Sequence, residues 1–198
     1  MEKINFGVIG AGTWGSAHAE IYSSHPATRL AAVCDTQEQK ARRLAQAYRQ
    51  VKIYREVKKM VEDPEIDAVA VVTPDFAHRE PILHAARAGK HIITEKPLAT
   101  SEEDLAAIRD ELQHRKISFM VDFHNRWNPP IAVLKEEIER GELGQIISAY
   151  FRLNDVLHVP STMLPWANRS SILWFLGSHA IDTLRFLFND EIHRVYAV

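Results

Sequence analysis

Gly10-Ala11-Gly12-Thr13-Trp14-Gly15 is the stretch that decides the fold. An apolar run, Ile4–Ile9, precedes it, and a second apolar run, Leu30–Cys34, ends at Asp35, twenty residues after the last glycine. Three glycines at this spacing let a chain turn off a strand, approach a pyrophosphate and pack a helix closely on a sheet. Free N–H groups at the start of a helix near Thr13 favour phosphate. The sequence therefore predicts a strand–turn–helix unit that binds a dinucleotide; a glycine turn without a ligand is the alternative.

The bulk composition is that of an ordinary globular protein: 198 residues, 46% hydrophobic and 25% charged. A net charge of −2 with dispersed Lys and Arg argues against nucleic acid as a partner. The single cysteine, Cys34, excludes an internal disulfide, fits a reducing compartment and is predicted to be buried and inert. We see no apolar run near the ~20 residues of a membrane helix and no signal peptide. We therefore expect a cytoplasmic protein with no membrane partner.

Residues 4–121 alternate short apolar runs with amphipathic segments, which predicts repeated βα units in a doubly wound parallel α/β sheet. The expected strands are Asn5–Ile9, Leu30–Cys34, Val51–Ile53, Ala68–Val72, His91–Thr94 and Ser118–Val121. The expected helices are Trp14–Ser23, Thr36–Tyr48, His78–Arg87 and Ser101–Gln113. Gly89 is expected to end the third helix, and Ser101 to cap the fourth.

The pattern changes after Asp122, so residues 1–122 and 123–198 are predicted to form two domains. Because a sheet of one or two strands is marginal, we expect the second domain to be incomplete or completed by another chain. Its expected elements are a helix from Pro129 to about Arg140, a strand Gln145–Leu153, an irregular segment Asn154–Ser170, a helix Ser171–Phe188 and the start of a strand at Ile192–Val198.

With Glu95-Lys96-Pro97 in view, the chain resembles the Gfo/Idh/MocA oxidoreductases. The resemblance implies a Rossmann domain followed by an α/β domain with an open-faced sheet, and NAD(P)-dependent redox chemistry on sugars, inositols or related polyols. Family members are much longer, which implies that this chain is C-terminally truncated; the missing sheet commonly makes an oligomer contact, so a homo-oligomer is expected. The matching stretches are Gly10–Gly15, Val72–His78, Ala88–Ala99, Asn125–Pro129 and Gly177–Asp182.

Asp35 is placed to accept hydrogen bonds from the adenosine ribose hydroxyls of the cofactor. Its carboxylate would repel a 2′-phosphate, so the sequence predicts NAD, with NADP disfavoured. The alternative is that Asp35 only caps the following helix at Thr36. Arg42 and Arg43 follow in that helix and could soften the preference for NAD.

Lys96 is the leading catalytic candidate. It follows an apolar strand and precedes a proline, which favours an extended conformation, so Glu95 and Lys96 should point to opposite sides. A cationic amine in the cofactor crevice could hold a substrate hydroxyl and stabilise alkoxide charge. By resemblance, Lys96 does this beside the nicotinamide and relays the proton, while Glu95 helps to place the cofactor. The alternative is a solvated surface pair.

Other cofactor contacts are expected from the resemblance. Thr73-Pro74 ends a strand at the carboxyl edge of the sheet, where ligands of open α/β sheets bind. This loop and His78 are expected to border the nicotinamide, with His78 as a surface helix residue as the alternative. Asn125 and Arg126 are expected near the cofactor or the interdomain cleft; a structural hydrogen-bonding role is the alternative.

His179 and Asp182 are three residues apart on one expected helix and share a face. His179 could take the proton of the substrate hydroxyl, or the two could be a polar pair without chemistry. Redox members of the family often carry an aspartate where this chain has Phe175, which cannot ionise. Asp155, His158 or Asp182 would then substitute, or the substrate is handled differently, or redox activity is lost.

The sequence thus predicts an NAD-dependent oxidoreductase that transfers hydride between a sugar, inositol or related polyol and nicotinamide. A nucleotide-sensing protein on the same scaffold and a non-redox enzyme that uses NAD transiently are the alternatives. No metal site is expected, because the ten histidines form no H-x-x-x-H pair and have no cysteine partners.

Overall fold

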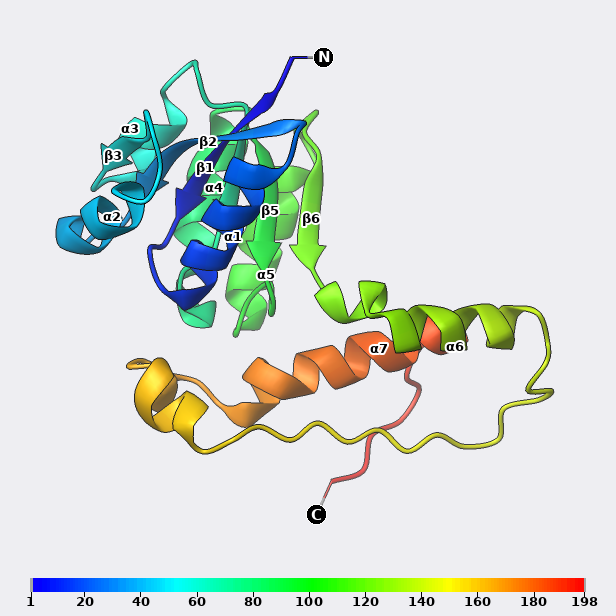
Figure 1. Ribbon diagram of the computed structural model, residues 1–198. Helices are drawn as coiled ribbons and strands as arrows, with labels where there is room; N and C mark the ends of the chain where they lie inside the picture. The colour runs from blue at the N-terminus through cyan, green and yellow to red at the C-terminus, as the bar shows by residue number, and fades with distance from the viewer. Residues whose placement is uncertain (1, 198) are drawn as a thin grey trace. The chain divides into compact units, whose positions relative to one another are not determined.

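The first compact unit of the chain, which ends at Asp122, is a six-stranded sheet with helices on both faces (Figure 1). The computed structural model describes residues 2–197. Every pair of neighbouring strands is parallel, in the order β3-β2-β1-β4-β5-β6, which is that of a Rossmann sheet. The predicted doubly wound parallel fold is confirmed. The strands are β1 (Ile4–Ile9), β2 (Thr28–Cys34), β3 (Lys52–Tyr54), β4 (Ala68–Val71), β5 (His91–Glu95) and β6 (Phe119–Asp122).

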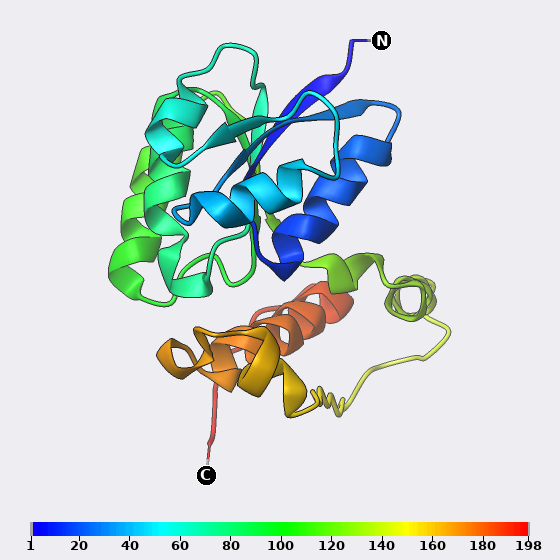
Figure 2. The same ribbon diagram turned by 60° about the vertical axis from the view of Figure 1, so that its left-hand side comes forward.

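Helices cover the sheet in two sets (Figure 2). One face carries α1 (Thr13–Ser24) and α2 (Glu38–Ala45), drawn in blue and cyan. The other face carries α3, α4 and α5, and a 3₁₀ turn, η1, precedes α4. Their bounds are α3 (Val57–Val61), η1 (Asp75–Ala77), α4 (Arg79–Arg87) and α5 (Glu102–Leu112).

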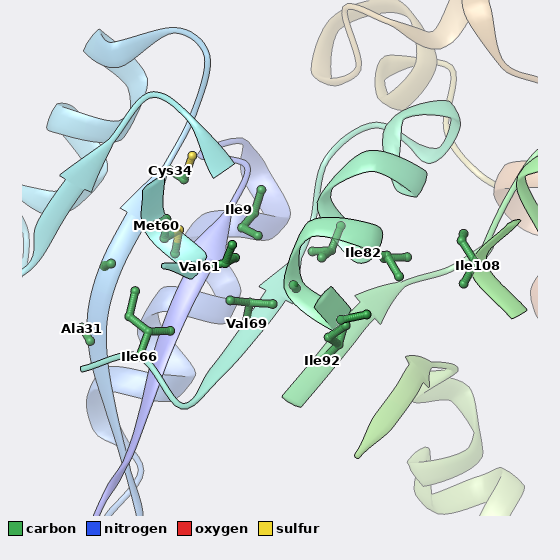
Figure 3. Packing of buried hydrophobic residues seen from close by; sticks show 14 residues of the cluster. Ile9, Ala31, Cys34, Met60, Val61, Ile66, Val69, Ile82, Ile92 and Ile108 are labelled. Atoms are coloured by element: carbon green, nitrogen blue, oxygen red, sulfur yellow. The ribbon is translucent and has the colours of Figure 1, made fainter. Parts of the chain in front are cut away.

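Successive residues of the central strands β1 and β4 contribute to opposite cores. Val8 packs with the α1 and α2 cluster, while Ile9 packs with the cluster under α3, α4 and α5. Figure 3 shows the second cluster, in which Met60, Ile82 and Ile108 reach the sheet from three different helices. Burial on both faces explains why these strands read as continuous apolar runs.

Local signals fix where several helices begin and end. The Ser101 hydroxyl accepts a hydrogen bond from Asp104 N at 3.2 Å, and Gly89 takes a left-handed conformation just after α4. The helix predicted over Thr36–Tyr48 is shorter, because the Asp35 carboxylate accepts from Gln37 N at 2.8 Å and holds the chain in a turn before α2. The five-residue α3 was not predicted, since it is too short to show a helical period.

The second unit begins at Phe123, and in the part that the structure describes its regular elements are helices and helical turns separated by irregular segments. Its two longest helices, α6 (Pro129–Glu139) and α7 (Ser178–Phe188), contact each other. A π-helical turn, η5 (Leu173–Gly177), runs directly into α7. The remaining elements are η2 (His124–Trp127), η3 (Val159–Met163) and η4 (Ala167–Arg169).

Two strand predictions in this unit are wrong. None of residues 145–153 or 192–197 is in a strand, and Val198 lies outside the described residues. A strand needs a hydrogen-bonded neighbour, and residues 123–197 provide none. Apolar side chains of the predicted strand, such as Ile147 and Tyr150, are consequently exposed. Over residues 2–197, no helix combines the length and apolar character that crossing a bilayer requires.

Candidate functional site

The glycine turn lies directly against the end of β4. Gly10 has a φ of +109°, and a Cβ built there would lie 2.6 Å from the carbonyl oxygen of Val72. A Cβ on Gly15 would overlap the carbonyl oxygen of Gly10. Side chains at these two positions are therefore excluded by conformation and by space, as the close packing of turn, strand and α1 requires.

Gly12 differs from its neighbours in the turn, because a Cβ there would meet nothing within 4 Å. It is the N-cap of α1, makes no side-chain capping bond, and no acidic residue follows in the first turn. The helix start thus presents backbone N–H groups beside open space that one methyl group would partly fill. This geometry fits a pyrophosphate.

Asp35 is held by backbone on both sides. Its Oδ2 accepts from Ala11 N in the glycine turn at 2.8 Å, and its Oδ1 accepts from Gln37 N at 2.8 Å. The second bond forms a turn rather than a helix cap, because α2 begins only at Glu38. The carboxylate is fixed at the end of β2 and retains acceptor capacity for ribose hydroxyls.

The structure also describes the surroundings of Arg42 and Cys34, two residues near Asp35. Glu38 accepts from Nε of Arg42 at 2.7 Å, so this arginine is already engaged by a carboxylate. Cys34 is buried as predicted, and burial, followed by the negative charge of Asp35, raises the pKa of its thiol to about 12. A thiol that stays protonated is inert, as expected.

His78 joins the ends of β4 and β5. Its Nδ1 lies 2.8 Å from the carbonyl oxygen of Pro97 and its Nε2 lies 3.0 Å from that of Thr73. The Thr73 hydroxyl donates to Ala77 O at 3.1 Å, and Pro74 is the N-cap of η1. His78 is 1% exposed, so the surface alternative is wrong, and burial lowers the pKa of its imidazole.

Glu95 and Lys96 are both buried at the end of β5, so the alternative of a solvated surface pair is wrong. Glu95 Oε2 accepts from the backbone N of Lys96 at 3.3 Å, and the Lys96–Pro97 peptide bond is cis. Two buried residues that carry a carboxylate and an amine therefore follow one another at the sheet edge that carries the glycine turn. That edge is where open α/β sheets bind ligands.

Sequence reasoning missed three residues here: His18, Tyr22 and Asp122. His18 Nε2 lies 3.2 Å from Glu95 Oε1 and 3.9 Å from Asp122 Oδ2, and its Nδ1 lies 3.0 Å from the hydroxyl of Tyr22. The i,i+4 spacing of the two α1 residues was a readable signal, as was the place of Asp122 at a strand end. Ligand atoms of His18, Glu95 and Asp122 lie within 4.8 Å of one another, and within this group His18 and Glu95 lie at hydrogen-bond distance.

In the second unit, Asp182 is paired with Arg126. The Nε of Arg126 donates to Asp182 Oδ2 at 2.8 Å and its second nitrogen contacts Oδ1, a bidentate pair that raises the pKa of Arg126. The carbonyl of the adjacent Asn125 accepts from Asn128 N at 3.1 Å. The Arg126–Asp182 pair holds η2 against α7, and the bond from Asn128 closes the end of η2.

His179 is buried on α7, one helical turn before Thr183, which is buried as well. Its ring meets that of His124 edge-on at 4.7 Å between centroids, and that of Phe123 at 6.5 Å. The π-helical turn η5 ends immediately before α7, and such turns are frequent at functional sites. The structure thus places His179 and Asp182 together on one buried face.

Phe175 lies in this π-helical turn and meets Trp166 edge-on, with 6.4 Å between ring centroids. Both rings line a largely apolar pocket of about 480 Å³, together with Asn154, Asp155 and Leu157. Asp155 Oδ1 accepts from the backbone N of Val156. The aromatic ring, rather than a carboxylate, therefore borders the pocket at this position.

The fold, the glycine turn and the acidic residue after β2 define a dinucleotide-binding α/β protein. A family model described as "Oxidoreductase family, NAD-binding Rossmann fold" matches residues 4–123, and a model of the GFO/IDH/MocA C-terminal domain matches residues 131–198. The chain belongs to the Gfo/Idh/MocA family, and its first unit is the NAD-binding Rossmann domain of that family.

Named relatives include two dehydrogenases. The chain is 32% identical to levoglucosan dehydrogenase of Pseudarthrobacter phenanthrenivorans, over 96% of this chain and 52% of that protein. It is 30% identical to scyllo-inositol 2-dehydrogenase (NAD(+)) of Bacillus subtilis, over 98% and 56% respectively. A solved structure of levoglucosan dehydrogenase in complex with NADH matches with a TM-score of 0.82 at 32% identity, over 94% of this chain and 54% of that one. The chain spans about half the length of the relatives it matches.

Proposed function

We propose that this chain acts in an NAD-dependent oxidoreductase that moves hydride between a hydroxyl carbon of a sugar, inositol or related polyol and nicotinamide. The observation that carries the proposal is the cradle at the start of α1, where Gly12 leaves open space beside backbone N–H groups. Lys96 is buried at the same sheet edge. The names of the two dehydrogenase relatives support the substrate class.

The residues that would hold NAD belong to the first unit. The turn from Gly10 to Gly15 would receive the pyrophosphate, Asp35 the adenosine ribose, and Thr73-Pro74 would border the nicotinamide. Asp35 is fixed by two backbone N–H groups and would repel a 2′-phosphate, which supports NAD over NADP. When bound, the nicotinamide ring supplies the hydride acceptor.

Lys96 and His179 are the candidate acid–base groups. The Lys96 amine would hold the substrate hydroxyl and stabilise the developing alkoxide charge, and His179 would accept the hydroxyl proton. Asp182 shares a face with His179, but both its oxygens are engaged by Arg126. We therefore assign Asp182 and Arg126 the role of positioning α7 against η2.

A nucleotide-sensing protein is the second candidate function. It is favoured by Phe175, whose ring packs against Trp166 where redox relatives often carry a carboxylate. Such a protein would bind NADH without turning over a polyol. Binding and turnover therefore have to be measured separately.

The test is a titration of tryptophan fluorescence with NADH and NADPH, followed by assays of NAD reduction with inositols, anhydrosugars and sugars. The Trp14→Phe variant assigns the quenching signal, because Trp14 stands in the first turn of α1. We expect saturable binding that favours NADH, and turnover that Lys96→Ala lowers about 100-fold or more. Binding without turnover on every polyol would support the sensor, and no binding of either nucleotide would contradict both functions.

We also propose a cytoplasmic homo-oligomer. The single buried Cys34 supports a reducing compartment. Exposed apolar side chains on the second unit, including Trp127, Ile147 and Tyr196, support association with further protein surface. Light scattering coupled to gel filtration measures the oligomeric state, and a monomer at micromolar concentration would contradict the proposed homo-oligomer.

A further inference from the structure

We propose that His18 is a positioning residue, which holds the carboxylate of Glu95, and through it the backbone at Lys96, against α1. The inference rests on the proposed function, in which Lys96 acts on the substrate. It assigns a task to a histidine that no motif of the sequence had marked.

Two successive contacts connect α1 to Lys96. His18 is the sixth residue of α1, and its Nε2 lies 3.2 Å from Glu95 Oε1. The other oxygen of the same carboxylate, Oε2, accepts from the backbone N of Lys96 at 3.3 Å. Glu95 is therefore a bridge with one oxygen on the helix and one on the lysine backbone.

The contacts of His18 define what each ring nitrogen does when Glu95 is ionised. An ionised carboxylate only accepts hydrogen bonds, so Nε2, which faces Glu95, then carries a proton. Nδ1 faces the hydroxyl of Tyr22 at 3.0 Å, and a phenol can donate to it. The Tyr22 ring is itself stacked on Phe6, at 4.0 Å between centroids. The imidazole is thus held from both nitrogens.

The groups around the imidazole come from three elements: Tyr22 on α1, Glu95 on β5 and Asp122 on β6. The side chains of His18 and Glu95 are each 8% exposed. A carboxylate oxygen that loses one of its donors in such a place cannot take water instead at low cost. Removing the imidazole should therefore move Glu95, and with it the lysine backbone.

This connection gives α1 two tasks in the same cofactor site. Its N-terminus faces the space beside Gly12, and its second turn holds the end of β5 through His18. Because the helix is rigid, the phosphate end and the lysine end of the site are set by one body. Loss of His18 should displace Lys96 while the glycine turn keeps its form.

The test is a double-mutant cycle with two readouts. His18→Phe keeps a ring without donors, Glu95→Gln removes the acceptor charge, and the double variant closes the cycle. The readouts are the dissociation constant for NADH and the rate of acetylation of the Lys96 amine by acetic anhydride, followed by mass spectrometry. His114→Phe, at an exposed histidine outside this network, is the matched control.

We expect His18→Phe to weaken NADH binding about tenfold, the factor that loss of a hydrogen bond to a charged group produces. Acetylation of Lys96 should change severalfold, and the double variant should be no worse than Glu95→Gln alone. His18→Gln, whose amide can still donate to Glu95, should recover much of both effects. The control should match the wild type.

Additive effects in the cycle, or an unchanged acetylation rate in folded His18→Phe, would overturn the proposal. If His18→Phe does not fold, Tyr22→Phe decides, because it keeps the stack on Phe6 and removes only the hydroxyl that contacts His18 Nδ1; an unchanged acetylation rate in folded Tyr22→Phe would equally overturn the proposal. If the wild type binds no NADH, the proposed function fails, while the acetylation rates still judge the link from His18 to Lys96.

Discussion

Gly10 and Gly12 lie two residues apart in one turn, yet a methyl group at each would have opposite consequences. At Gly10 the methyl group would press on the carbonyl oxygen of Val72, and the positive φ would be strained. At Gly12 the backbone is extended, with φ −87° and ψ −161°, and the methyl group would enter open space. Folding constrains the first glycine, and the ligand is expected to constrain the second.

We predict that Gly12→Ala changes the free energy of unfolding by less than about 0.5 kcal/mol but weakens NADH binding at least about tenfold. Urea titration gives the first quantity and fluorescence titration the second. Gly10→Ala is the matched control and should lose about 2 kcal/mol or more of stability. Full NADH affinity in folded Gly12→Ala would contradict the pyrophosphate site.

We predict that Asp35→Asn lowers NADH affinity about tenfold and narrows the preference over NADPH, because the charge that repels a 2′-phosphate is gone. The ratio of the two dissociation constants is the measurement. Asp110→Asn, at an exposed position of α5, controls for the loss of one negative charge. An unchanged ratio would mean that Asp35 has only a structural role, in the turn that it forms with Gln37.

At the scale of elements, Asp63 ties β3 to the segment after α3. Lys52 Nζ and the Tyr54 hydroxyl both donate to Asp63 Oδ2, at 2.7 Å and 2.6 Å. Bonds from Lys52, Tyr54 and the backbone of Glu65 hold the pKa of Asp63 at about 2. This carboxylate therefore stabilises the fold only while it is ionised.

We predict that Asp63→Asn costs about 1–2 kcal/mol of unfolding free energy at pH 7, after allowance for the half-exposed Lys52. The pKa is lower in the folded state than in the unfolded state, so the stabilisation is present above about pH 4 and fades as the pH falls towards 2. Urea midpoints of both proteins at pH 7 and pH 3 measure the difference. An equal deficit at the two pH values would contradict the ionic origin.

His78 connects two loops in the same unit, and its titration should be visible in stability. Burial keeps its pKa below that of an unfolded histidine, so the unfolded state takes up the proton first as the pH falls. We predict that the wild type loses stability between pH 7 and pH 5 and that His78→Gln loses less over this range. His114→Gln is the control, and identical pH slopes in all three proteins would contradict the assignment.

Most elements of the first unit were predictable, because its central strands are buried on both faces and helix ends such as those at Ser101 and Gly89 carry local signals. Val69 and Ala70, for instance, pack into opposite cores and read as one apolar run. The second unit has no strand of this kind in the part that the structure describes. The apolar residues of 145–153 suggested a strand, but pairing depends on a partner that their own pattern does not specify.

At the scale of the molecule, some site residues could be predicted from motif spacing and others could not. The order of strand ends brings the glycine turn, Asp35, Thr73 and Lys96 to one edge, and a parallel sheet makes that outcome predictable from spacing. The contact of His18 with Glu95 joins residues 77 positions apart and depends on how α1 lies on the sheet. Motif spacing carries no information about such a crossing.

The second unit has its own ionic connection, so its stability should vary separately. We predict that Arg126→Gln destabilises this unit by about 1–2 kcal/mol, because buried Asp182 loses its bidentate partner while Arg126 itself is 41% exposed. Hydrogen exchange in α7 should accelerate, and NADH affinity should change less than threefold. Arg140→Gln is the exposed control; a large loss of affinity would place Arg126 at the cofactor instead.

The strand order also has a consequence for synthesis on the ribosome. β1 pairs with β2 on one side and with β4 on the other, and β4 begins 59 residues after β1 ends. At about 5–20 residues per second, the nascent half-sheet exposes an open, apolar β1 edge for about 3–12 s. During that interval the edge can recruit a strand from a neighbouring nascent chain on the same polysome. Chaperone demand should therefore peak before Ala68 leaves the exit tunnel and decline once β4 has docked.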